Sequence, residues 1–106
     1  MRAGRYALEV ELNTALVQQS TATLEKKGKT MITWRSNGKL GERFWVTTNG
    51  SGLIYLPPRG QWASDVSGKV QHHPVPKSGW ENYDWLYLRE PKDVAYALGV
   101  LKAEVL

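Results

Sequence analysis

The sequence contains no cysteine, which excludes a disulfide scaffold, a thiol nucleophile and a cysteine-ligated zinc site. No apolar run approaches the roughly 18–20 residues that a membrane-spanning helix needs. The first twelve residues, MRAGRYALEVEL, lack the apolar core and the cleavage site of a signal peptide. We therefore expect a cytoplasmic protein without a membrane partner.

Familiar catalytic motifs are also missing. There is no Gly-x-Ser-x-Gly elbow, and the Gly-Lys-Thr at 28–30 lacks the glycine that a P-loop carries five positions earlier, where Thr23 stands. The adjacent His72 and His73 have no third ligand at metal-site spacing. The sequence thus predicts no catalytic residue, no metal site and no cofactor.

Acidic residues are scarce in the middle of the chain. The 106 residues carry a net charge of +4, but residues 26–80 hold nine basic and only two acidic side chains, whereas residues 81–106 are slightly acidic. A hydrophobic fraction of 42% is ordinary for a folded protein, and the length suits a single domain over residues 1–106. A basic middle segment indicates an anionic partner.

Alternating apolar residues predict strands early in the chain. Residues 5–12 have the pattern of a half-buried strand. Its apolar face would consist of Tyr6, Leu8, Val10 and Leu12. Residues 14–27 fit a strand or a helix, and the alternation across 21–25 favours the strand.

Two tight-turn signatures, NGK and NGSG, separate the strand-like segments TMITWRS, ERFWVTT and LIYL. Consecutive strands joined by tight turns form an antiparallel meander. We therefore predict an antiparallel sheet across residues 5–56, which ends at Pro57-Pro58 because proline has no N–H for a sheet ladder.

Residues 57–80 hold four of the five prolines and show no persistent period. They predict a long loop, and Trp62 and Trp80 argue that the loop is ordered, since disordered segments are poor in aromatic residues. A further strand is predicted over 82–89.

A helix is predicted over 91–105, with Pro91 at its first position and Asp93 in its first turn. The expected fold is α+β: a meander of about five antiparallel strands, as a sandwich or a partly open barrel, packed by one C-terminal helix.

Basic residues and tryptophans are interleaved in the central strands. If Phe44 and Val46 pack inward, Arg43 and Trp45 face outward together, as an aromatic ring and a cation do in a nucleic-acid surface. We expect this surface to carry no neutralising carboxylate. The predicted nucleic-acid-binding residues are Lys26, Lys27, Lys29, Arg35, Arg43, Trp45, Arg59 and Trp62.

These patterns predict a small, non-enzymatic module that binds DNA or RNA. One alternative is a protein-interaction, inhibitor or accessory module, monomeric or homodimeric, that uses an aromatic surface. The aromatic surface of this second hypothesis would include the row Tyr83, Trp85 and Tyr87. The sequence leaves open whether this row is a packed core face or an open platform. A third hypothesis is a small ribonuclease that uses His72 or His73 as an acid or base.

Overall fold

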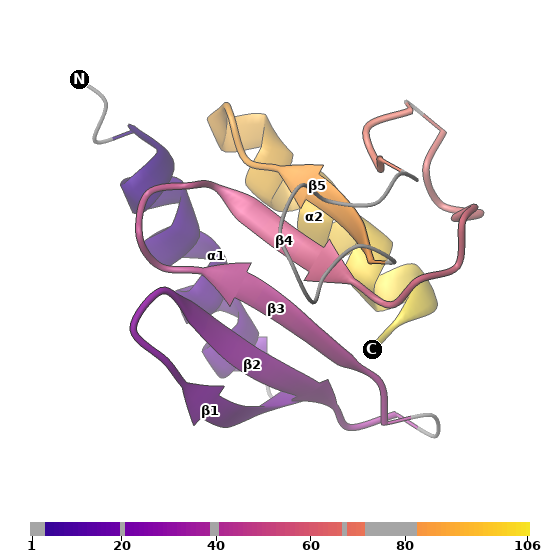
Figure 1. Cartoon of the computed structure of the whole chain (residues 1–106). Helices are drawn as coiled ribbons and strands as arrows, with labels where there is room; N and C mark the ends of the chain where they lie inside the picture. The colour runs from indigo at the N-terminus through magenta and orange to yellow at the C-terminus, as the bar shows by residue number, and fades with distance from the viewer. Residues whose placement is uncertain (1–3, 20, 39–40, 67, 72–82) are drawn as a thin grey trace.

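The computed structural model describes residues 4–19, 21–38, 41–66, 68–71 and 83–106, which form one sheet and two helices (Figure 1). The sheet is an antiparallel meander in the order β1-β2-β3-β4-β5, and both helices lie behind it in Figure 1. The elements are α1 (Gly4–Gln19), β1 (Ala22–Lys27), β2 (Met31–Ser36), β3 (Arg43–Thr47), β4 (Leu53–Leu56), β5 (Asp84–Tyr87) and α2 (Pro91–Glu104). The predicted α+β class, meander and C-terminal helix are confirmed, and the sheet is open and five-stranded.

The predicted strand over residues 5–12 is wrong, because this segment belongs to helix α1, and the sheet begins only at Ala22. The side chains that α1 buries include Leu8, Leu12 and Leu16, which recur at the helical spacing of four. Tyr6 and Val10, the other members of the expected strand face, are exposed. The ambiguous segment 14–27 is therefore divided between the end of α1 and strand β1.

The helix-facing side of the sheet, the inner face, forms the core. In β2, and in β3 as far as Val46, every second residue is buried, which is the alternation expected of a sheet covered on one side. On this face the buried apolar side chains of β2 to β5, together with Leu88 after β5, are Ile32, Trp34, Phe44, Val46, Ile54, Leu56, Leu86 and Leu88. Those of α2 are Val94, Ala97, Val100 and Leu101. Tyr55 of β4, on the opposite face of the sheet, is also buried, at 4% exposed.

A buried carboxylate joins α1 to the turn between β3 and β4. Glu9 is 1% exposed, and its carboxylate accepts hydrogen bonds from the Thr47 hydroxyl, from Gly50 N at 2.8 Å and from Gly52 N at 2.7 Å. Gly52 O in turn accepts a hydrogen bond from Leu88 N at 2.7 Å. This turn therefore connects the first helix with the end of β5.

Gly52 has to be glycine at this junction. Its φ of +69° lies in the left-handed region, and a Cβ atom there would lie 2.8 Å from Leu88 O. Both the backbone angle and the close approach of another backbone exclude a side chain.

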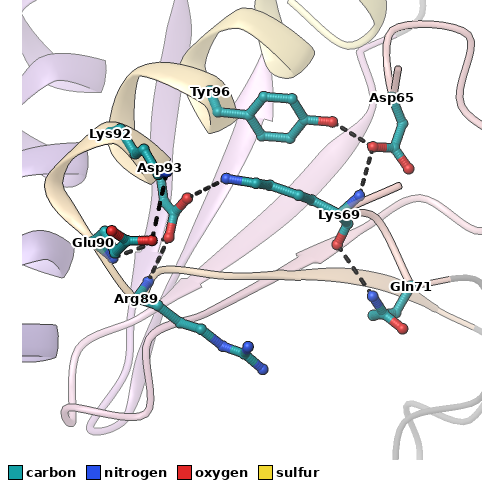
Figure 2. A network of polar contacts seen from close by, with 8 residues as sticks. All are labelled: Asp65, Lys69, Gln71, Arg89, Glu90, Lys92, Asp93 and Tyr96. Atoms are coloured by element: carbon teal, nitrogen blue, oxygen red, sulfur yellow. Dashed lines mark hydrogen bonds and ion pairs between the residues drawn. The ribbon is translucent and has the colours of Figure 1, made fainter. Parts of the chain in front are cut away.

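Residues 57–66 and 68–71, the described part of the segment predicted to be a loop, are packed against the sheet and α2. Trp62 and Val70 are buried in the core, and Gln71 forms a β-bridge with Trp85. Asp65 accepts hydrogen bonds from the backbone N–H groups of Lys69 and Val70 and from the Tyr96 hydroxyl of α2 (Figure 2). Trp80 lies outside the described residues.

Asp93 fixes the beginning of α2. Its carboxylate accepts hydrogen bonds from Arg89 N at 2.9 Å and Glu90 N at 3.0 Å, as in a capping box, and Lys69 Nζ lies 2.6 Å from its other oxygen (Figure 2). Burial alone would raise the pKa of Asp93, but the hydrogen bonds from Lys69 and from the two backbone N–H groups lower it below the ordinary 3.8.

We predict that Glu9→Ala lowers the free energy of unfolding by about 3 kcal/mol, because buried donors of the turn lose their acceptor. Urea denaturation monitored by circular dichroism measures this loss. Glu11→Ala, two residues along α1 at an exposed position, is the control and should change stability by less than about 0.5 kcal/mol. Equal losses in the two variants would contradict this role of Glu9.

We predict that Asp93→Asn costs about 1–2 kcal/mol at pH 7, because charge-assisted hydrogen bonds are lost. Since the folded-state pKa is lowered, the stability from ionised Asp93 is present above its ordinary pKa of 3.8 and is lost as the pH falls below that value. The difference between wild type and variant should therefore shrink between pH 5 and about pH 2. If urea titrations show that the stability difference between wild type and Asp93→Asn is the same at every pH, this role of the Asp93 carboxylate is refuted.

Candidate nucleic-acid interface

The face of the sheet opposite the two helices, called here the outer face, carries the expected pairing of cation and indole. Phe44 and Val46 are buried inward, whereas Arg43 is exposed and Trp45 is half-buried on the outer face. The outward direction predicted for Arg43 and Trp45 is therefore correct.

Strand register brings a second arginine and further aromatic rings to the same face. Arg35 of β2 lies directly opposite Arg43 of β3. Trp45 lies opposite Tyr55, and Tyr55 lies opposite Trp85 of β5. The Trp45 ring also meets the Tyr83 ring edge to face, with 5.1 Å between the centroids.

The expectation that no carboxylate neutralises this surface is wrong, because Glu25 binds both arginines. Its carboxylate lies 2.6 Å from Arg43 Nε and 3.0 Å from Arg35 Nη2. Glu25 occupies the irregularity in the pairing of β1 with β2, between Leu24 and Lys26, and such a bulge redirects a side chain.

The ion pairs change the electrostatics of all three groups. The hydrogen bond from Arg43, followed by the contribution of Arg35, lowers the pKa of Glu25, and Glu25 raises the pKa of Arg43. One negative charge is thus shared between two guanidinium groups that face each other across the strands, and one positive charge is left over.

The three predicted lysines lie on or directly after edge strand β1. Lys26 and Lys27 are exposed on edge strand β1, and Lys29 is exposed in the following turn. Among the residues with described positions, none of the three has an ion-pair partner. Lysines also protect an edge strand from pairing with another chain, which is a structural reason for their presence.

Arg59 and Trp62, the other two residues predicted to bind nucleic acid, are engaged in contacts within the fold. Trp62 is 3% exposed, and its indole N–H donates to Asp84 Oδ2 at 2.6 Å, so its ring offers no open face to a base. Arg59 stacks on that ring, with Cζ 4.4 Å from the centroid, and forms an ion pair with Glu42. Both side chains have packing roles.

A pocket of about 240 Å³ opens on the outer face, between the arginine pair and the segment that follows β4. Its walls combine two cations, two aromatic rings and two prolines. The lining residues are Arg35, Gly41, Glu42, Arg43, Trp45, Pro57, Pro58 and Tyr83. Sequence reasoning missed Tyr83 and the prolines as site residues, although the alternation of Tyr83, Trp85 and Tyr87 indicated a shared face.

The described residues contain no group of three or more His, Asp or Glu side chains that could hold a metal ion. His72 and His73, on which the ribonuclease hypothesis depends, lie outside them. No helix in the described ranges is long and apolar enough to cross a membrane.

Comparison with protein-family models, with curated proteins and with solved structures gave no match for this chain. A functional assignment therefore has to come from the geometry of the site itself.

Proposed function

We propose that this protein binds single-stranded nucleic acid on the outer face of its sheet. The observation that carries the proposal is the pocket in which Arg35 and Arg43 lie beside the Trp45 and Tyr83 rings. Binding of single strands without sequence preference uses this combination of cations along the backbone and rings for the bases.

Arg43 is the best placed group for a phosphate. Glu25 engages its Nε and, at 3.3 Å, its Nη2, while Nη1 makes no hydrogen bond among the described contacts. Its side chain is 50% exposed. The Arg35 guanidinium has fewer free N–H groups, because it donates hydrogen bonds to Glu25 and to Gly41 O. Its role is therefore to add positive charge beside Arg43.

Trp45 and Tyr83 supply the apolar wall. Their edge-to-face contact fixes the two rings relative to each other, which lowers the entropic cost of presenting them to a ligand. Stacking of one base on an aromatic ring contributes about 1–3 kcal/mol.

The surrounding charge favours a polyanion over a neutral ligand. Lys26, Lys27 and Lys29 add three positive charges along edge strand β1 and the turn that follows it. The register places Lys26 opposite Thr33, which is two residues from Arg35 along β2 and on the same face. If these lysines and Arg43 each contact a phosphate, log Kobs should fall with log salt concentration with a slope of about −2 to −3.

We predict that Trp45→Ala raises the Kd for fluorescein-labelled (dT)12 or (rU)12 by about 5- to 100-fold, because one stacking surface is lost. Fluorescence anisotropy at 50 mM salt measures this change. Trp45→Phe keeps an aromatic ring and should retain most of the affinity. Thermal melting shows whether both variants are folded.

We predict that Glu25→Gln strengthens binding by about three- to tenfold and steepens the salt dependence, because both guanidinium groups lose their counter-charge. Glu11→Gln makes the same change of net charge on the exposed side of α1 and is the matched control. Equal gains in both variants, or weaker binding by Glu25→Gln, would speak against the outer face as the binding site.

Absence of binding to any oligonucleotide at 50 mM salt would overturn the proposed function. The protein-interaction alternative would then take its place. Its supporting observation is the exposed apolar stripe of Tyr6, Val10 and Val17 along α1.

A further inference from the structure

A second pocket, of about 280 Å³, lies at the opposite end of β5. Its walls include Lys69, Gln71, Tyr87, Arg89 and Asp93. It shares no lining residue with the first pocket, but the same strand leads to both, since Tyr83 precedes β5 and Tyr87 ends it.

Two guanidinium groups flank the Tyr87 ring. Arg89 Cζ lies 4.7 Å and Arg5 Cζ 6.0 Å from its centroid. In the part of the chain that the structure describes, neither arginine forms an ion pair. The Trp85 ring meets Tyr87 edge to face at 4.8 Å, so the cluster is continuous with the aromatic row of β5.

The other charged groups around this pocket already have partners. Lys69 is bound by Asp93, and Glu90 lies 3.8 Å from Lys92 Nζ. Figure 2 shows the Arg89 side chain pointing away from the Asp93 carboxylate, which receives only its backbone N–H. The positive charge available to a ligand at this end is therefore that of Arg5 and Arg89.

The two cation–aromatic clusters lie on one line. Tyr83, Trp85, Tyr87 and Arg89 occupy alternate positions and face the same side. Tyr83 and Tyr87 are four residues apart, or about 13 Å along the strand. A stacked single strand advances about 3.4 Å per nucleotide, so about four nucleotides cover that distance.

We propose that Arg5, Tyr87 and Arg89 form a second subsite for the same single strand, which runs along β5 from the Arg43–Trp45 pocket. This inference rests on the proposed function and adds a site size and a path. The two arginines would contact phosphate, and Tyr87 would support a base or sugar between them.

The test is the length dependence of binding for (dT)n with n of 2, 4, 6, 8 and 12, measured by anisotropy in wild type and in Arg5→Gln/Arg89→Gln. We expect the affinity of wild type to rise steeply between two and six nucleotides. The double variant should lose this gain, bind (dT)12 about tenfold more weakly and show a salt slope smaller by about 1.4, which is two phosphate contacts.

Lys92→Gln/Lys102→Gln removes the same charge from exposed positions of α2 and should keep the length dependence of wild type. The second subsite is refuted if (dT)12 binds wild type and Trp45→Ala weakens it, but the arginine variant keeps the wild-type length dependence and salt slope. Failure of wild type to bind any length refutes the proposed function and, with it, the second subsite. Thermal melts of both double variants exclude unfolding as the cause of a loss.

Discussion

The buried Glu9 carboxylate is the interaction on which the arrangement of the elements depends. It holds the turn between β3 and β4 against α1, and the same turn receives the backbone N–H of Leu88 through Gly52 O. A charge buried in this way is stable only while its hydrogen bonds are complete. Helix α1, the centre of the sheet and the end of β5 are therefore fixed together, and Arg5 is placed beside Tyr87 one helical turn before Glu9.

Local patterns were sufficient where one periodicity fits the residues. The burial of Phe44 and Val46 follows from simple alternation, as does the opposite direction of Trp45, and α2 begins at the predicted proline. Residues 5–12 fit both periods, because Leu8 and Leu12 are two alternations and also one helical turn apart. The segment is a helix because the spacing of four continues to Leu16 and because most of its residues favour helices. The eight residues 5–12 alone do not include Leu16, so they do not distinguish a helix from a strand.

The candidate site was harder to predict because its charges are set by contacts between strands. Residues 26–80 form a strongly basic segment by composition, but Glu25, one residue before it, reaches from β1 across β2 to Arg43 of β3. That contact depends on a bulge and on the register, which composition does not contain. The contacts of Trp62 and Arg59 are equally hard to read from the sequence, because their partners, Asp84 and Glu42, are 22 and 17 residues away.

The arginines with described positions, together with Lys69, fall into three groups by their ion pairs. Arg59 and Lys69 each have a carboxylate of their own and tie loops to the rest of the fold. Arg35 and Arg43 share one carboxylate. They lie directly opposite each other on the neighbouring strands β2 and β3, an arrangement of like charges that weakens a sheet. Arg5 and Arg89 stack on one ring with no ion-pair partner among the described residues. Among the described residues the outer face therefore keeps a surplus of positive charge, and the proposed binding of a polyanion rests on this surplus.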